Sequence, residues 1–373
     1  MANPEDAPLL DGIRVVEMGQ YIPAPYAGLM LSELGADVIK IEPPAGDPMR
    51  HLGTARIDGT APGYHAMNGG KRVTFLDLKT DAHRQIALDL IAQADVLIES
   101  YRPGVLDRLG LGRDVLTRTN PALVHCSISG FGQTGPYAAK AGHDLNYMAA
   151  AGALHVSGTP ETPVIARTPI SDYASAMQGA TTILAALLRR GRTGLGAHID
   201  VSMTDTALSW QSHILAAAMA GERPERGRDF EDGGLAAYNI YRTSDDRFIG
   251  LGAEEPKFWK NFCHAIGRED WLERFREPMP QLDLSADLAA LFQAKPAAEW
   301  AALLEPADCC FQLLLTFEEA LEWPQFVERR IFHRTSDGAV HVLFPAWIDN
   351  RPPRAREAYR QCDPDEIGKA WTD

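Results

Sequence analysis

The sequence predicts an α/β protein in which a large domain with a parallel sheet is followed by a second domain. Apolar strand-like runs alternate with helix-like segments over most of residues 10–220. A charged, glycine-containing stretch at 221–232 then indicates a linker. The 373 residues also exceed what a single hydrophobic core usually organises. We therefore expect two domains of unequal size that divide near residue 225.

The first strand–helix–strand unit lies at the start of the large domain. Gly12–Glu17 and Ala36–Ile41 are short apolar runs. Between them, Pro23–Leu34 has helical spacing, with proline at its start and Gly35 after its end. Such a unit predicts parallel strands covered by helices. Its glycines do not form the Gly-x-Gly-x-x-Gly pattern, so the sequence does not indicate a dinucleotide site.

The rest of the chain differs before and after the linker: strands alternate with helices before it, and a hairpin is followed by helices after it. Residues 47–70 are polar, lack periodicity and predict a long loop. Further strands are expected at 71–79, 95–99, 123–128 and 198–202, with helices at 80–94, 113–119, 174–190 and 203–220. After the linker we expect a hairpin of 237–242 with 247–252 and helices at 257–266, 285–293 and 296–304.

Composition narrows the range of partners. A net charge of −14 and a pI near 5.3 disfavour nucleic acid, and an anionic ligand would need local basic groups. The five cysteines have no metal-like or disulfide-framework spacing, which favours reduced thiols and a cytoplasmic location. Neither a signal peptide nor an apolar run of about 18 residues is evident, so we expect no membrane partner.

The stretch Ala141–Tyr147 is the strongest candidate for chemistry. It places His143 and Asp144 behind a glycine, soon after the strand at 123–128. Histidine titrates near neutral pH, and ligands of open parallel sheets collect at the carboxyl ends of strands, which favours proton transfer at His143. A helix cap or a surface pair is the structural alternative.

Two further carboxylates lie next to helix starts. Asp172 precedes a long helix rich in small residues, and Glu255 precedes Pro256 at the entrance of another helix. Free backbone N–H groups and the helix dipole favour a carboxylate at such positions. Capping is therefore the alternative role for both residues, and for Asp172 it is the stronger interpretation when that residue is considered alone.

Several motifs together resemble CoA-transferase family III, and within it the α-methylacyl-CoA racemase branch. They are Leu10–Glu17, Leu34–Glu42, Thr74–Lys79, Ala94–Val105, Ser129–Pro136 and Ala141–Tyr147. The likeness covers most of residues 8–260. It implies a Rossmann-like large domain over 1–225 that is completed by about 330–373, and a small α/β domain over 226–330. It also implies a homodimer of two protomers threaded through each other as linked rings.

The resemblance also implies an acyl-CoA thioester substrate, with CoA as part of that substrate and with no metal and no permanently bound cofactor. Racemases of the family often have an arginine where this chain has Pro43, so Lys40 is expected to contact the CoA phosphate instead. The other positions that the resemblance assigns to CoA are Leu76, Asp77, Leu78, Lys79, Arg102, Gly142, Asp144, Leu145, Asn146 and Tyr147.

Two reactions of the family remain open, and they use Asp172 differently. Racemisation by 1,1-proton transfer needs a base on each face of the α-carbon and stabilisation of the enolate oxygen. The resemblance assigns one face to His143, assisted by Glu255, and the other to Asp172. In a transferase, Asp172 would instead attack the acyl-CoA to form a mixed anhydride.

The sequence favours the racemase. Family transferases usually have tyrosine at the position of His143, whereas Glu255 and the stretch 232–238 resemble the racemase version. We therefore expect an α-methylacyl-CoA racemase, with a CoA-transferase as the alternative. A third possibility, an acyl-CoA-binding subunit without turnover, predicts the loss of a catalytic group, but His143, Asp172 and Glu255 are all present.

Overall fold

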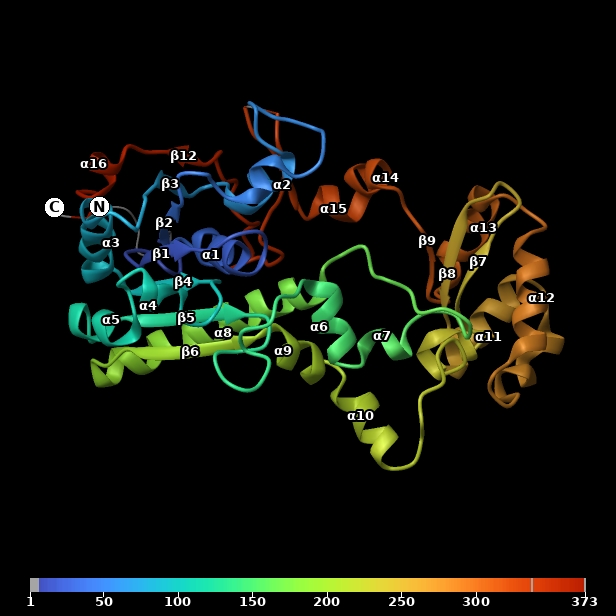
Figure 1. Ribbon diagram of the computed structural model, residues 1–373. Coiled ribbons are helices and arrows are strands. Elements are labelled where there is room, and N and C mark those ends of the chain that lie inside the picture. The colour runs from blue at the N-terminus through green and yellow to red at the C-terminus, as the bar shows by residue number, and fades with distance from the viewer. Residues whose placement is uncertain (1–6, 337, 372–373) are drawn as a thin grey trace. The chain divides into compact units, whose positions relative to one another are not determined.

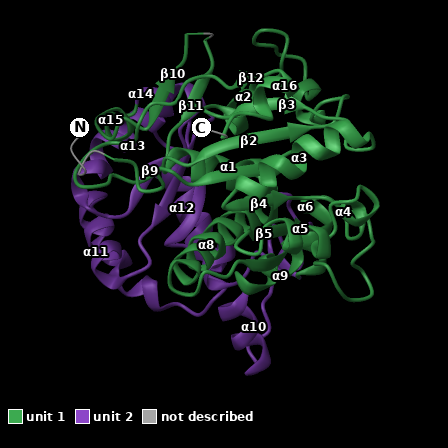
Figure 2. Ribbon diagram, turned by 90° about the vertical axis from the view of Figure 1, so that its left-hand side faces the viewer, with its two compact units in different colours: residues 1–151, 167–210, 323–373 green, residues 152–166, 211–322 purple. Residues whose placement is uncertain are grey.

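The computed structural model describes residues 7–336 and 338–371 (Figure 1). The chain forms two compact units, coloured separately in Figure 2. Unit 1 comprises Met1–Ala151, Arg167–Trp210 and Trp323–Asp373, and unit 2 comprises Gly152–Ala166 and Gln211–Glu322. The sequence places the divisions near 225 and 330, whereas the contacts place them after Trp210 and Glu322. The charged stretch 221–232, which was expected to link the domains, lies within unit 2. Residues 152–166 also belong to unit 2, which the sequence did not predict.

Unit 1 contains a seven-stranded parallel sheet with the order β12-β3-β2-β1-β4-β5-β6, which confirms the predicted fold class. The strands are β1 Arg14–Met18, β2 Asp37–Glu42, β3 Arg72–Phe75, β4 Val96–Glu99, β5 Val124–Ser129, β6 Ala197–Ser202 and β12 Arg360–Gln361. The chain winds outward in both directions from β1, which pairs with β2 on one side and β4 on the other. Ligands of such sheets bind at the carboxyl ends of the strands near this switch point.

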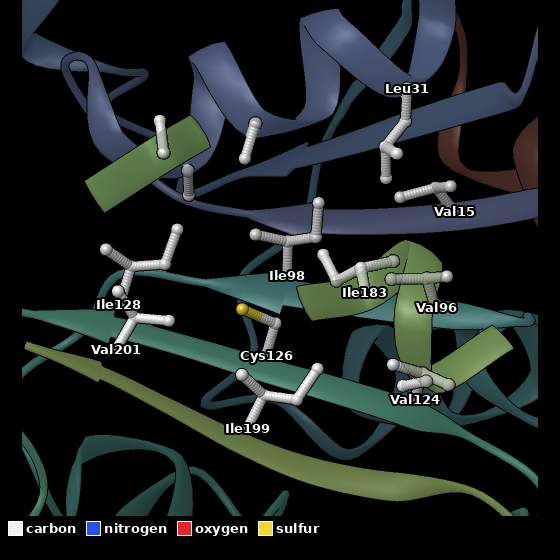
Figure 3. Packing of buried hydrophobic residues seen from close by; sticks show 14 of the residues in the cluster. Val15, Leu31, Val96, Ile98, Val124, Cys126, Ile128, Ile183, Ile199 and Val201 are labelled. Atoms are coloured by element: carbon white, nitrogen blue, oxygen red, sulfur yellow. The ribbon is translucent and has the colours of Figure 1, made fainter. Parts of the chain in front are cut away.

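Helices cover both faces of this sheet. On one face, α1 (Pro23–Glu33) and α8 (Ile170–Thr193) pack over a core that includes Val15, Ile98 and Cys126 (Figure 3). On the other face lie α3 (Asp81–Gln93), α4 (Val105–Arg108), α5 (Arg113–Thr119) and α16 (Pro364–Ile367). Adjacent strand residues point to opposite faces, and both faces are buried, which explains the almost continuous apolar strands.

Three expectations need correction, two within unit 1 and one for a segment that crosses into unit 2 after Trp210. The predicted loop 47–70 contains a 3₁₀ helix, η2 (Pro48–His51), and α2 (Pro62–Asn68), each of which starts with a proline. The predicted helix 203–220 is interrupted at Trp210 and forms α9 (Met203–Ser209) and α10 (Ser212–Met219). Helix α8 begins at Ile170, so Asp172 lies within its first turn and not before it.

Unit 2 has a three-stranded antiparallel sheet in the order β7-β8-β9. The predicted hairpin is present as β7 (Tyr238–Arg242) and β8 (Phe248–Gly252), and β9 (Phe311–Leu313), which the sequence analysis did not identify, pairs with β8. The predicted helices are α11 (Pro256–Ala265), α12 (Leu282–Phe292) and α13 (Ala297–Leu304). They bury an aromatic core around Trp259, Phe262 and Trp300 against the sheet.

The remaining segments are short. They include α6 (Asp144–Ala150), α7 (Ala153–Val156), α14 (Phe317–Glu322), α15 (Pro324–Glu328) and the two-stranded sheet of β10 (Phe332–Arg334) with β11 (Val340–Val342). Across the described ranges, no helix combines the length and the apolar character that crossing a membrane requires.

Candidate active site

A cavity of about 460 Å³ lies in unit 1 at the carboxyl end of the parallel sheet. Its lining comes from segments after four strands, namely 20–23 after β1, 100–103 after β4, Gly130 after β5 and Met203 after β6. The lining also includes Tyr147 on α6, His143 as the N-cap residue of that helix, and Asp172 on α8. The cavity therefore occupies the place where open parallel sheets bind their ligands.

His143 is both a helix cap and a cavity residue. It is the N-cap of α6, where the side-chain Oδ1 of Asn146 accepts a hydrogen bond from its backbone N–H at 3.0 Å. Its side chain is exposed, lines the cavity and meets the ring of Tyr21 edge-on, with 6.1 Å between ring centroids. The backbone thus serves the helix start, while the imidazole remains accessible to a ligand.

Asp172 lies in the first turn of α8 and lines the same cavity. Its side chain is half-buried. Burial, together with the nearby Asp144 carboxylate, raises the pKa of Asp172 to about 7. A carboxylate with such a pKa can accept and return a proton at neutral pH.

The loop that carries His143 is fixed by Tyr147. The buried ring of Tyr147 lies against Gly130 and Gly142, where an added Cβ would approach it to 2.5 Å and 2.6 Å. Its hydroxyl donates to the carbonyl oxygen of Gly142 at 2.6 Å. Both glycines are required by this close approach, because any side chain there would displace the ring.

Two cationic side chains line the cavity. Arg102 and Lys140 are both exposed, and the Nζ of Lys140 lies 3.6 Å from the ring centroid of Tyr137. Within residues 7–336 and 338–371, no carboxylate lies within ion-pair distance of Arg102. In a chain of net charge −14, these groups supply the local positive charge that an anionic ligand needs.

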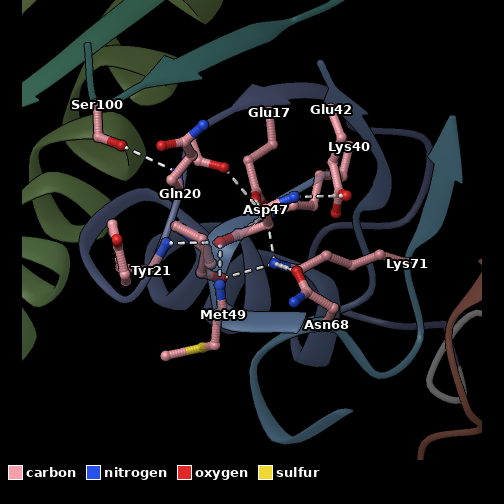
Figure 4. Close-up of polar contacts among 12 residues, drawn as sticks. Glu17, Gln20, Tyr21, Lys40, Glu42, Asp47, Met49, Asn68, Lys71 and Ser100 are labelled. Carbon is pink, nitrogen blue, oxygen red and sulfur yellow. Dashed lines mark hydrogen bonds and ion pairs between the residues drawn. The ribbon is translucent and has the colours of Figure 1, made fainter. Parts of the chain in front are cut away.

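Lys40 does not belong to this cavity, which corrects its expected role. Its side chain is fully buried, and its Nζ donates to Glu17, Asp47 and the carbonyl oxygen of Gly19, each at 3.0 Å (Figure 4). An ammonium group has three donors, and all three are used. Lys40 therefore cannot hold a phosphate without breaking buried ion pairs.

The ionic cluster of Glu17, Lys40, Asp47 and Lys71 instead holds the cavity wall. The Oδ1 of Asp47 accepts hydrogen bonds from the backbone N–H groups of Tyr21, at 3.2 Å, and Met49, at 2.9 Å. Both of these residues line the cavity. Tyr21 also has a left-handed backbone, with φ of 60°, which this hydrogen bond helps to maintain. The cluster thus positions the loop after β1.

The other end of the cluster is equally buried. The Nζ of Lys71 donates to Glu17 at 2.7 Å, to the carbonyl oxygen of Pro25 at 2.7 Å and to Asn68 at 3.2 Å. Burial lowers the pKa of Lys71 to about 8, although Glu17 opposes this shift. Burial would raise the pKa of Glu17, but Lys71 and Lys40 outweigh that effect and lower it. Glu17 is therefore an ionised, structural carboxylate.

Several of the expected CoA contacts do not line this cavity. Leu76 and Leu78 are buried in the core beneath α3, so their side chains are not available to a ligand. Asp77 forms the turn before α3, where its N–H donates to the Nδ1 of His83 at 2.9 Å. Lys79 is exposed in the same turn, and Leu145 and Asn146 are exposed on α6. Any contact of these residues with CoA remains a prediction.

Glu255 belongs to unit 2. It is the N-cap residue of α11, but its exposed side chain makes no capping hydrogen bond. The capping role considered from sequence is therefore not observed. Its assistance to His143 remains a prediction.

Four residues at or behind the cavity wall were not predicted from the sequence: Tyr21, Met49, Lys140 and Asp47. Tyr21 lies three residues after the end of β1, and Lys140 lies just before the candidate stretch Ala141–Tyr147, so their positions were a usable signal. Asp47 and Met49 were assigned to a featureless loop, and only the fold brings them to the cavity.

The sequence and the structure of this chain are similar to those of known proteins. The family model for CoA-transferase family III matches residues 10–362. A probable fatty acyl-CoA transferase of Mycobacterium tuberculosis is 33% identical and covers 96% of this chain and 98% of its own. The α-methylacyl-CoA racemase of Mus musculus is 34% identical over 94% of this chain and 89% of its own. A crystal structure of a CaiB/BaiF family protein from Brucella suis superposes with a TM-score of 0.85 at 29% identity, covering 98% of both chains. The chain therefore belongs to CoA-transferase family III.

Proposed function

We propose that this enzyme is an acyl-CoA racemase that transfers a proton at the α-carbon of a 2-methylacyl-CoA thioester. The observation that carries the proposal is that His143 and Asp172 line one cavity. They come from different helices, α6 and α8, which allows them to approach an α-carbon from two sides. A proton transfer between the faces of one carbon needs two such bases.

The proposed reaction proceeds through an enolate. One base removes the α-proton, and the protonated form of the other returns a proton to the opposite face. The developing enolate oxygen needs a donor. We propose the backbone N–H of Asp144, which follows the cavity residue His143 and among the described residues donates to no acceptor. The positive end of the α6 dipole would add to this stabilisation.

Binding of the CoA part is proposed to use the two free cations. Arg102 and Lys140 would donate hydrogen bonds to its phosphates, and the apolar lining that includes Ile22, Met49 and Val105 would contact less polar parts of the substrate. We propose no cofactor beyond the CoA that the substrate carries.

A CoA-transferase is the second candidate, and one observation favours it. The Asp172 carboxylate lines the cavity and would serve as the nucleophile that attacks an acyl-CoA. The similarity to a protein named as a probable fatty acyl-CoA transferase supports the same alternative.

Deuterium exchange separates the two reactions. A racemase incorporates deuterium from D₂O at the α-carbon of 2-methylacyl-CoA when no acceptor acid is present. A transferase does not; it requires a carboxylate acceptor, and hydroxylamine traps its acyl group on Asp172. Exchange without acceptor supports the racemase proposal, whereas a trapped acyl-aspartate without exchange contradicts it.

We also propose that the chain works as an interlocked homodimer, as its family resemblance implies. Two linked rings cannot separate without unfolding, so mass photometry at nanomolar concentration should show dimers only. Monomers that appear on dilution would contradict the interlocked arrangement and would leave the site proposal unaffected.

A further inference from the structure

Asp144 binds the start of the helix that carries Asp172. Its Oδ1 accepts two hydrogen bonds from Ser171, one from the backbone N–H and one from the hydroxyl, both at 2.7 Å. Ser171 is fully buried, so these bonds are shielded from water. We call this pair of hydrogen bonds the Asp144–Ser171 clamp.

The clamp replaces a missing helix cap. The N-cap residue of α8 is Pro169, which has no polar side chain to accept the free N–H groups of the first turn. Asp144, which begins α6, supplies the acceptor from another helix. The start of α8 is therefore fixed to the loop that presents His143.

The clamp also places a negative charge beside Asp172, the residue after Ser171. Two carboxylates that share a partly buried site disfavour each other's ionisation. Burial is the largest cause of the raised pKa of Asp172, and Asp144 is the second. The other titratable or charged groups around Asp172 are Tyr147 on α6, Tyr173 on α8, Tyr26 on α1 and the cavity residues His143, Arg102 and Lys140.

We propose that Asp144 is a positioning residue for Asp172: its two hydrogen bonds to Ser171 fix the first turn of α8 and hold the Asp144 carboxylate close to Asp172. This role differs from the CoA contact that the family resemblance implies for Asp144. Its value for catalysis rests on the proposed function, but the titration of Asp172 can be measured without any turnover.

The test follows the ¹³Cγ signals of labelled aspartates against pH, with the Asp172 signal assigned by its absence in Asp172→Asn. Asp144→Asn keeps an oxygen acceptor for Ser171 and removes the charge. The titration midpoint of Asp172 should fall by about one pH unit. Ser171→Ala is the matched control, because it removes one hydrogen bond and keeps the charge. It should move the midpoint by less than half as much while lowering the melting temperature.

An unchanged Asp172 midpoint in Asp144→Asn would overturn the proposal, as would an equal shift in Ser171→Ala. If Asp144→Asn does not fold, Asp144→Ser carries the same test, since its hydroxyl can still accept from Ser171. The pH profile of α-proton exchange distinguishes the two proposals. A shifted Asp172 midpoint without any exchange contradicts only the racemase, and exchange with an unshifted midpoint contradicts only the role of Asp144.

Discussion

Glu17 and Glu99 are buried carboxylates on neighbouring parallel strands, but their surroundings differ. Glu17 on β1 is fully buried and contacts two lysines, Lys40 and Lys71, which lower its pKa. Glu99 on β4 is 4% exposed and has no lysine or arginine partner within the described residues. Burial therefore raises the pKa of Glu99 to about 7.

The comparison extends to the candidate site. Asp172 is half-buried, and like Glu99 it has no lysine or arginine partner within ion-pair distance among the described residues. The pKa of Asp172 is raised as well. In this molecule a carboxylate with buried counter-charges holds the fold, whereas one without them can change protonation near neutral pH. Of the four predictions below, three test that difference and one tests ligand binding in the cavity of Asp172; they run from the largest expected effect to the smallest.

Glu17→Gln should cause the largest loss of stability. It leaves the ammonium groups of Lys40 and Lys71 buried without their shared carboxylate, which typically costs about 3–5 kcal/mol of unfolding free energy. Urea unfolding measures this loss. Glu273→Gln is the control, because its pair with Arg276 is exposed and should contribute little. A loss for Glu17→Gln as small as that of the control would show that the ionic cluster does not hold the fold.

Glu99→Gln should change how stability depends on pH. The folded-state pKa of about 7 lies above the ordinary 4.5, so the stabilising contribution of Glu99 is full below pH 4.5 and is lost as pH rises through 7. Glutamine cannot ionise and avoids this loss, so its unfolding free energy relative to wild type should rise by about 3 kcal/mol between pH 4.5 and 8. Parallel pH curves for the two proteins would refute a neutral Glu99.

His125 makes the unfolding free energy depend on pH in the opposite direction. Its Nε2 lies 3.9 Å from the Oε1 of Glu99. Burial lowers the pKa of His125 to about 3, so its contribution is present above the ordinary value of 6.5 and is lost as pH falls toward 3. The comparison of Glu99→Gln with wild type largely cancels this contribution, because both proteins keep His125.

Arg102→Ala should weaken CoA binding without changing stability. If Arg102 holds a phosphate, its removal loses a charge-assisted hydrogen bond and weakens affinity by about 10–100-fold. Isothermal titration with CoA measures the effect. Arg108→Ala is the matched control, since Arg108 is an exposed arginine of α4 that does not line the cavity. Equal affinities for the two variants would exclude Arg102 from the binding site.

The smallest expected effect is on the pH dependence of α-proton exchange. If Asp172 removes the α-proton, exchange from its face should be slow below pH 7, where the carboxyl is protonated, and should level off above it. A profile from that face that already levels off near pH 4 would show an ordinary, solvated aspartate.

The sequence predicted the fold class well because the strand and helix periods are regular in unit 1. Glycine and proline marked the ends of α1, and the apolar runs of β1, β2 and β5 lay at the predicted places. It failed within 47–70, because polar residues such as Asp47 and Arg50 are buried by ion pairs that no local pattern reveals. Lys40 was misassigned for the same reason, since its partners Glu17 and Asp47 come from other segments.

Of the candidate site, the stretch Ala141–Tyr147 indicated His143, and the family resemblance indicated Asp172; the fold brings both to one cavity. Local motifs did not indicate the clamp, because Ser171 and Asp144 are separated by a segment that belongs to unit 2. Nor did they indicate Tyr21 beside His143, which depends on the hydrogen bond from its N–H to Asp47.

The central claim is that His143 and Asp172 act on opposite faces of one α-carbon. The most direct test is deuterium exchange of the separate R and S forms of a 2-methylacyl-CoA in D₂O, without acceptor acid, by wild type, His143→Ala and Asp172→Asn. Each variant should lose exchange from one enantiomer by about 10²–10⁴-fold and largely keep exchange from the other, with opposite preferences. Equal loss from both enantiomers in both variants, or no exchange in the wild type, would contradict the account.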